Sequence, residues 1–300
     1  MRIAAGPISW GVCEVPGWGL QLEPERVLGE MRSLGLRATE AGPAGYLGAD
    51  PASIRDLLDR HGLELVGGFL PIVLHDPAQL DAALEKVRRT AALFAQLGAS
   101  VLCSALVLDE GWATPRPLAD AEWRHLLGAL RRVDEVAAEH GVAHVLHPHW
   151  GTLLERDADV SRVVAESEVA LCLDTGHLAL GGTDTVALAA QAAHRVAHVH
   201  LKDVDAAVAE RLRTGELSLV QAVQAGLFRP LGAGDAPIAE TVLGLERAGY
   251  RGWYVLEQDV ALAGPPQPGQ GPLDDVRRSL DFLHALARDA APAAAAREGG

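Results

Sequence analysis

Two short stretches of the chain end an apolar run on side chains that can bind a metal or move a proton. The first, LCLDTGHLAL, contains Asp174 and His177 three residues apart. The second, HVHLKDV, places His200 and Lys202 two residues apart. A carboxylate and imidazoles brought together could hold a divalent cation, and an amine beside them could donate a proton.

The elements that must position these side chains are short β-prone runs alternating with longer amphipathic stretches. Strands are expected at 3–10, 36–42, 63–70, 100–106, 143–150, 169–175, 196–202 and 252–259. Helices are expected at 24–34, 51–61, 77–97, 119–140, 157–166, 184–193, 235–248 and 272–288. Glycines in LGL, HGL, LGA, HGV and AGY follow several of these helices, where a left-handed residue can close the last turn.

This alternation predicts an α/β fold, a single-domain (β/α)8 TIM barrel spanning 1–289. A doubly wound open sheet is the alternative, but no GxGxxG follows the first strand. The segment 203–234 is longer than a connection needs, and we expect it to form an extra loop and helix over the barrel mouth. The segment 290–300 is low in complexity and is expected to be a disordered tail.

Composition excludes several classes of protein. The formal net charge is −14 and no basic run occurs, which argues against a nucleic-acid partner. Cys103 and Cys172 lie in apolar runs, as reduced core cysteines do. The N-terminus shows no leader, and no run is long enough to span a membrane, so we expect a soluble cytoplasmic protein.

Polar residues gather where the expected strands end, which is where barrel active sites form. Besides those named above, the strand ends carry Trp10, Glu40, His147, His149 and Glu257, with Asp259 beyond. Strand alternation puts His147 and His149 on one face. It does the same for His198, His200 and Lys202. Mixed imidazole and carboxylate ligands suit Mn²⁺, Co²⁺, Zn²⁺ or Fe²⁺ better than Ca²⁺.

Each of these residues also has an ordinary structural interpretation. Asp174 could cap the helix that follows it, Glu40 could be a loop carboxylate, and Lys202 could form a solvated ion pair with Asp203. Five other histidines are expected to be structural or surface residues when taken singly: His61, His125, His144, His194 and His198. The joint placement at strand ends is what favours a functional site.

Several motifs resemble those of the sugar phosphate isomerase/epimerase superfamily of xylose-isomerase-like barrels. They are LCLDTGHLALGGTD, RVAHVHLKDV, FRPLGAGD and GYRGWYVLEQD. Within the superfamily the chain looks most like the inosose dehydratases of myo-inositol catabolism. The stretches PISWG and HPHWGT also resemble the sequence pattern of this subgroup. The resemblance covers Ile3 to about Leu286 and implies an enzyme acting on a small sugar or cyclitol, with a homo-oligomer as a family-level expectation.

The resemblance also implies metal ligands at Asp174, His200 and Glu257. A fourth ligand, commonly Glu in the family, falls on His147, with His149 as its competitor. Mn²⁺ or Co²⁺ are the first candidates, and Zn²⁺, Fe²⁺ or Mg²⁺ are alternatives.

By the same resemblance, His177 and Lys202 would contact the substrate, and Trp10, Glu40 and His149 would line its pocket. The implied chemistry removes a proton beside a ketone to give an enolate, with Glu257 or Glu40 as the base and His177 or Lys202 as the acid.

Loss of a hydroxyl from the enolate would make the protein a dehydratase, and reprotonation would make it an isomerase or epimerase. A metal-dependent nuclease for abasic DNA and a non-catalytic cyclitol-binding barrel are the rivals. The negative net charge argues against the nuclease, and the intact ligand set argues against the non-catalytic barrel. No phosphate-binding glycine loop stands out, which favours an unphosphorylated substrate.

Overall fold

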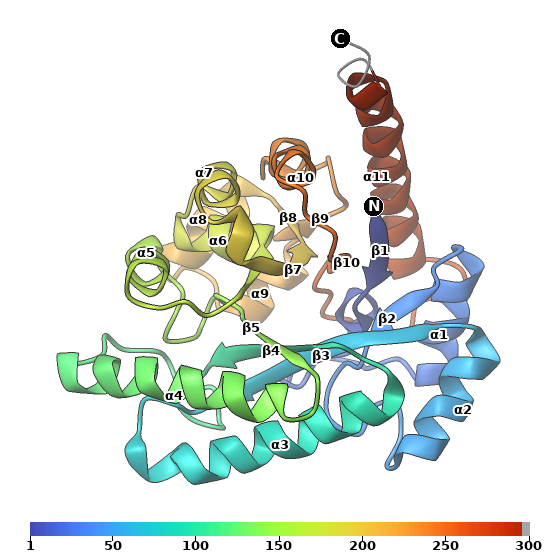
Figure 1. The fold of residues 1–300 in the computed structure, drawn as a ribbon. Helices are drawn as coiled ribbons and strands as arrows, with labels where there is room; N and C mark the ends of the chain where they lie inside the picture. The colour runs from blue at the N-terminus through green and yellow to red at the C-terminus, as the bar shows by residue number, and fades with distance from the viewer. Residues whose placement is uncertain (296–300) are drawn as a thin grey trace.

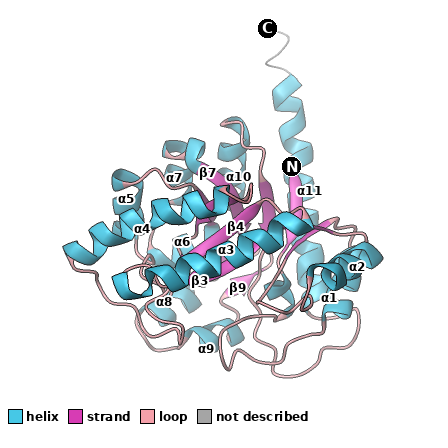
Figure 2. Ribbon diagram, turned by 60° about the horizontal axis from the view of Figure 1, so that its bottom comes forward, coloured by secondary structure: helices cyan, strands magenta, loops and turns pink. Residues whose placement is uncertain are grey.

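The computed structural model of the protein describes residues 1–295, and a closed barrel of parallel strands forms its centre (Figures 1 and 2). The barrel strands are β1 (Arg2–Ala5), β2 (Ala38–Glu40), β3 (Glu64–Ile72), β4 (Val101–Leu106), β5 (Ala143–Leu146), β6 (Leu171–Asp174), β7 (Val196–Leu201) and β10 (Trp253–Leu256). They neighbour one another in chain order, and β10 pairs with β1 to close the ring. The predicted (β/α)8 barrel is confirmed.

Helices surround the barrel, as Figure 2 shows around the strands. They are α1 (Pro24–Ser33), α2 (Pro51–His61), α3 (Leu80–Leu97), α4 (Asp120–Ala138), α5 (Asp157–Glu166), α6 (Thr175–Gly181), α7 (Thr185–Gln191), α8 (Ala206–Arg213), α9 (Leu219–Gln224), α10 (Ile238–Arg247) and α11 (Pro272–Ala295). Short 3₁₀ turns occupy η1 (Pro7–Trp10), η2 (Pro77–Gln79) and η3 (Ala193–Arg195). The glycines expected to end helices have positive φ: Gly35, Gly62, Gly98, Gly141 and Gly249.

The C-terminal helix α11 runs to Ala295, beyond the predicted end of the last helix. A disordered tail at 290–300 stays a prediction, and residues 296–300 lie outside the described part of the chain.

Several strands are shorter than the sequence indicates, and the difference builds the barrel mouth. The first strand stops at Ala5, and Pro7 begins η1, because proline has no backbone N–H to add to a strand. The fifth strand stops at Leu146, so the HPHW stretch after it is loop. Trp10, His147, His149 and Glu257 therefore lie just beyond the strands, whereas Glu40, Asp174 and His200 lie within the ends of β2, β6 and β7.

The segment 203–234 forms a two-helix excursion beside the mouth, rather than one loop and one helix. A two-stranded ribbon of β8 (Asp203–Val204) and β9 (Phe228–Arg229) encloses α8 and α9. The buried Asp203 carboxylate holds this excursion, accepting backbone hydrogen bonds at 2.8–3.0 Å from Val204, Gly232, Gly234 and Ala236. Asp203 is thus an anchor and not a solvated partner of Lys202.

The apolar core lies between the strands and the helices. Figure 1 shows α3 and α4 side by side on the outside of the sheet, and α3 contacts β3 and β4. Val27, Leu28 and Met31 of α1 are fully buried, as are Val87 and Ala91 of α3. This burial fixes the barrel wall that carries the strand ends.

One chain of hydrogen bonds ties α4 to the outside of the barrel. His144 Nε2 lies 2.6 Å from Ser104 Oγ, and His144 Nδ1 lies 2.5 Å from Asp134 Oδ1. The two ring nitrogens of His144 thus bridge the side chains of Ser104 in β4 and Asp134 in α4. This Ser104–His144–Asp134 relay makes His144 a structural residue, as expected.

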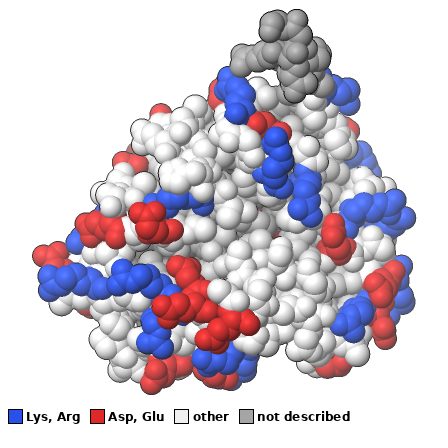
Figure 3. Space-filling model, in the orientation of Figure 1, with Lys and Arg blue, Asp and Glu red and all other residues white. Residues whose placement is uncertain are grey.

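The surface mixes charges of both signs. On the face drawn in Figure 3, the Lys and Arg side chains are interspersed with Asp and Glu and do not merge into one basic surface. Among residues 1–295, no helix combines the length and apolar character needed to cross a membrane.

Candidate active site

Two imidazoles and two carboxylates meet inside the mouth of the barrel. His147 Nε2 lies 3.2 Å from Asp174 Oδ2, and His200 Nδ1 lies 3.1 Å from Glu257 Oε2 and 3.7 Å from Asp174 Oδ2. These four residues come from the ends of β5, β6, β7 and β10, and each is at least nine-tenths buried. The structure therefore brings together the whole predicted ligand set.

Asp174 does two things with its two oxygens. Oδ1 accepts hydrogen bonds of 2.8 Å from the backbone N–H groups of Gly176 and His177 and so caps α6. Oδ2 faces His147 and Lys202. The capping interpretation is thus confirmed for Oδ1, and Oδ2 remains free of the cap and lies in the cluster.

Two glycines make room for the cluster. A Cβ on Gly176 would lie 2.5 Å from Lys202 Cβ, so only glycine lets the DTGH turn pack against Lys202. A Cβ on Gly6 would lie 2.8 Å from Glu257 Oε1. Gly176 is needed for close approach, Gly6 leaves room for the Glu257 carboxylate, and neither glycine has a positive φ.

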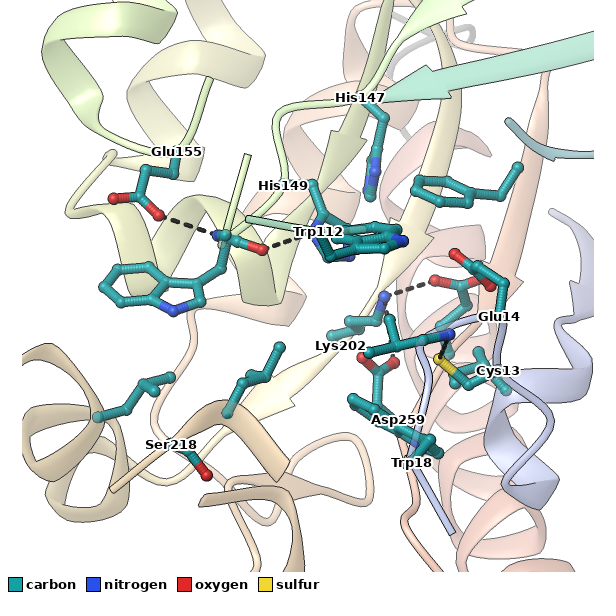
Figure 4. A pocket seen from close by; sticks show the side chains of 18 of the residues that line it. Cys13, Glu14, Trp18, Trp112, His147, His149, Glu155, Lys202, Ser218 and Asp259 are labelled. Atoms are coloured by element: carbon teal, nitrogen blue, oxygen red, sulfur yellow. Dashed lines mark hydrogen bonds and ion pairs between the residues drawn. The ribbon is translucent and has the colours of Figure 1, made fainter. Parts of the chain in front are cut away.

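Lys202 lies among acceptors. Its Nζ is 2.6 Å from Glu257 Oε2, 3.1 Å from Asp174 Oδ2 and 3.2 Å from Asp259 Oδ1. Burial alone would lower the pKa of Lys202, but the carboxylates of Asp174, Asp259 and Glu257 outweigh it and hold the pKa well above its usual value. Lys202 is therefore a charged donor, and Figure 4 shows it beside Asp259, with which it lines the cavity.

Glu40 reaches the cluster from the opposite side of the barrel. Its Oε1 lies 2.7 Å from His198 Nε2 and 3.2 Å from His200 Nε2. His198 was expected to be merely structural, yet it lies in the barrel interior and positions a cavity-lining carboxylate. His198, His200 and Lys202 share one strand face, as alternation predicts.

The two histidines after β5 have different surroundings. His147 belongs to a group in which His147, Asp174 and His200 each offer a ligand atom, with the three atoms within 4.8 Å of one another. His149 instead stacks on His177, with ring centroids 3.7 Å apart, and its Nδ1 lies 2.6 Å from the Trp150 carbonyl. The geometry therefore favours His147 as the fourth ligand and puts His149 on the cavity wall. His177, which was expected to contact the substrate, is buried next to His149 and is not among the residues that line the cavity.

His177 lies between two donors. The Trp150 N–H points at its Nδ1 over 3.3 Å, and Lys202 Nζ lies 3.2 Å from its Nε2. Burial, the neighbouring His149 and Lys202 keep its pKa well below the usual value, so the ring is neutral. A neutral imidazole has one acceptor nitrogen, so only one of the two contacts can be a hydrogen bond at a time.

The donor set fits a divalent cation. His147 Nδ1 is buried and has no hydrogen-bond partner among the described residues, and His200 Nδ1 is buried against the carboxylates of Glu257 and Asp174. Burial opposes a charge on His200, but Glu257 and Glu40 outweigh it and raise its pKa well above the usual value. The buried carboxylates thus require positive charge nearby, and a cation held by two imidazoles and two carboxylates would supply it.

A cavity of about 640 Å³ opens above the cluster, with Glu40, His147, Lys202, Glu257 and Asp259 among its lining residues. The rings of Phe69 and Trp112 stack on its wall with centroids 6.3 Å apart. Trp112 is the one non-glycine residue with positive φ in the described chain, at 57°. Strained residues of this kind cluster at active sites and ligand-binding positions.

The structure corrects the expectation for Trp10. That residue is completely buried in the core, where its Nε1 donates to Glu30 Oε2 over 2.8 Å, and it does not line the cavity. Trp112, Trp18 and Trp150 line the cavity instead. Sequence reasoning missed Trp18 and Trp112 because they lie in loops outside the expected strands. It placed Trp150 at the end of the expected strand 143–150 but did not single it out.

Comparison with known proteins identifies the protein family to which this barrel and its strand-end cluster belong. The family model of the xylose isomerase-like TIM barrel matches residues 28–286, and the chain belongs to this family. The resemblance seen in the sequence is thereby confirmed.

Several individual proteins are similar to this chain in sequence or in fold. The inosose dehydratase of Geobacillus kaustophilus is 33% identical over 281 residues, which cover 88% of this chain and 90% of the relative. The rhizopine catabolism protein MocC of Rhizobium meliloti is 35% identical over 268 residues, covering 86% and 82%. The structure of an L-ribulose 3-epimerase has the same fold, with a TM-score of 0.71, 18% identity and coverage of 98% and 96%.

Proposed function

We propose that the protein is a divalent-metal-dependent lyase that dehydrates a keto-cyclitol, an inosose, through an enolate. One observation carries the proposal: two imidazoles, two carboxylates and a lysine converge under one cavity, from His147, His200, Asp174, Glu257 and Lys202. The identity of 33% to an inosose dehydratase supports the substrate class.

The four proposed ligands are His147, Asp174, His200 and Glu257. A divalent cation held there, with Mn²⁺ and Co²⁺ as first candidates, would polarise the carbonyl of the substrate and stabilise negative charge on its oxygen. The barrel contributes a buried site in which such charge stabilisation is stronger than in water.

Glu40 is the proposed base. It lines the cavity, and His198 and His200 fix its Oε1, which orients the carboxylate. Glu257 is the other candidate, but its Oε2 already contacts Lys202 and His200. A positioned carboxylate can take a proton from the carbon next to a carbonyl.

Lys202 is the proposed acid for the leaving hydroxyl. Removal of the proton by Glu40 breaks the C–H bond, a C=C bond forms, and the C–O bond breaks on the next carbon. The hydroxyl leaves as water with a proton from Lys202, and transfer of the Glu40 proton to Lys202 through solvent restores both groups. His177, 3.2 Å from Lys202 Nζ, helps to position the ammonium.

A sugar or keto-inositol isomerase or epimerase is the second candidate. Glu40 and Glu257 both line the cavity, so two carboxylates could exchange protons with one substrate ring. Return of the proton at a new position, without loss of water, gives an isomer or epimer.

A proton NMR time course with 2-keto-myo-inositol in D₂O tests the proposal, using Mn²⁺- or Co²⁺-loaded protein and removing metal from quenched samples. We expect an unsaturated or dione product. Deuterium incorporation into an isomeric ketone, without loss of water, would assign the second candidate function instead. An unchanged substrate would contradict the proposed substrate.

A further inference from the structure

The cavity is larger than the reacting ring. It measures about 640 Å³. A keto-cyclitol has about twelve non-hydrogen atoms, and each takes less room than the ~30 Å³ of a water molecule in the liquid, so the ring fills at most about 360 Å³. Nearly half of the cavity therefore lies beyond the ring.

Four apolar side chains line a part of this cavity that is separate from the proposed reactive groups. We call this part the apolar outer wall. The apolar outer wall consists of Val15, Trp18, Leu212 and Leu219. These four residues pack in one hydrophobic cluster, in which the loop after η1 meets the two-helix excursion. In Figure 4, Trp18 and Ser218 lie away from His147 and Trp112, on the far side of Lys202.

The apolar outer wall is a second apolar surface in the same cavity. Phe69 and Trp112 already stack next to His149, beside the reactive groups, and can cover one face of a sugar-sized ring. A ring that bears hydroxyls on every side gains little from a further apolar wall, whereas an apolar group buried there is stabilised in proportion to its area.

The charges around the cavity disfavour an anionic occupant of this wall, and its apolar side chains disfavour a charge of either sign. Arg156 is paired with Glu155 at 2.9 Å, and Arg213 is paired with Glu210 at 3.2 Å. Glu14 also lines the cavity and would repel an anionic group.

We infer that the substrate is a keto-cyclitol or keto sugar with a neutral, apolar, ring-sized substituent joined through oxygen, which the apolar outer wall binds. The inference rests on the proposed function, because that function places the reacting ring next to the proposed reactive groups.

The test compares 2-keto-myo-inositol with its mono-O-benzyl ethers on the metal-loaded enzyme. We expect kcat/KM for at least one ether to exceed that of the unsubstituted ring by about tenfold or more. A second readout is binding of benzyl β-D-glucopyranoside, which has no ketone, followed by tryptophan fluorescence, since Trp18, Trp112 and Trp150 line the cavity.

Leu219→Asp is the test variant. Leu219 is the first residue of α9, directly after the Ser218 cap, where a carboxylate suits the helix dipole, so the fold should persist. The substitution puts a charge in the apolar outer wall and should reduce the ratio of kcat/KM between ether and unsubstituted ring about fivefold or more. Leu217→Asp is the control, because Leu217 packs on the same cluster without lining the cavity, and the ratio should stay near the wild-type value.

The outcomes separate the inference from the proposed function. Turnover of the unsubstituted ring without preference for any ether would overturn the inference and leave the function in place. If no ring is turned over, the proposed function fails, and the glucoside titration decides the inference. Saturable binding that Leu219→Asp weakens supports the apolar outer wall, and absence of binding overturns it.

Discussion

Replacing Lys202 with methionine should lower the stability of the protein without metal and raise its affinity for the metal. Lys202 is one of two lysines in the chain, the other being Lys86. Its ammonium contacts Asp174, Glu257 and Asp259 at 2.6–3.2 Å, and two of these are proposed metal ligands. Methionine keeps the length of the side chain and removes the charge.

The two effects have different sizes as well as opposite signs. Removal of one partner from a buried ion pair destabilises a protein by about 3–5 kcal/mol, and three carboxylates share this ammonium, so we expect a value near the upper end. Two unit charges about 4 Å apart interact by ~4 kcal/mol at an effective dielectric constant of ~20. Even partial relief of the competition for Asp174 and Glu257 should therefore increase metal affinity at least about tenfold. Turnover should fall by about 10²–10⁴-fold if Lys202 is the acid.

Urea unfolding with and without Mn²⁺, titration calorimetry of Mn²⁺ binding and the NMR assay together measure these effects. Lys86→Met is the matched control, because Lys86 pairs with Glu110 at the surface and its loss should change stability by no more than ~0.5 kcal/mol. Weaker metal binding together with unchanged stability of the metal-free protein would refute the reasoning, since the ammonium would then not compete with the cation.

Four further substitutions test separate parts of the site. Asp174→Ala removes a proposed ligand and the α6 cap. Metal analysis should find no bound metal, and circular dichroism should show a folded barrel whose free energy of unfolding is lower by about 1–2 kcal/mol. Retained metal would contradict the ligand assignment. Glu40→Gln should keep the metal and lower kcat by about 10²–10⁴-fold, and an undiminished kcat would require another base. Asp203→Asn puts a donor against backbone N–H groups and should reduce the free energy of unfolding by about 2–3 kcal/mol in thermal melts, whereas an unchanged melting temperature would show that the carboxylate does not anchor the excursion. Trp112→Gly should relieve about 1–3 kcal/mol of backbone strain yet raise KM, and an unaltered KM would exclude Trp112 from ring binding.

The sequence predicts the barrel and much of the cluster for a common reason. In parallel strands, side-chain direction follows from position, so HVHLKDV already implies that His198, His200 and Lys202 point the same way. The glycines that were expected to end five helices have positive φ, and the parallel pairing of the strands places their carboxyl ends at one edge. Fold and candidate cluster thus both derive from local periodicity.

What the sequence does not predict depends on loops. The direction of Trp112 results from a positive φ that no local pattern requires, and Trp18 reaches the cavity through a loop held by its hydrogen bond to the Val260 carbonyl. Trp10 was misplaced for a related reason, since η1 replaces the expected strand end and turns the indole into the core. The choice between His147 and His149 likewise needed the stacking of His149 on His177.

The Ser104–His144–Asp134 relay has the side chains and the order of contacts of a hydrolase catalytic triad, in which a nucleophile, a base and an orienting acid act together. It cannot act as one, because Ser104 is wholly buried beneath the helix layer, while its neighbour Cys103 packs inside the barrel. Alternate residues of a barrel strand face either the barrel interior or the helix layer. The side that a residue faces thus decides whether a substrate can reach its side chain. The distances between these polar atoms alone would suggest hydrolase activity. The side of the sheet on which Ser104 lies excludes it for this relay.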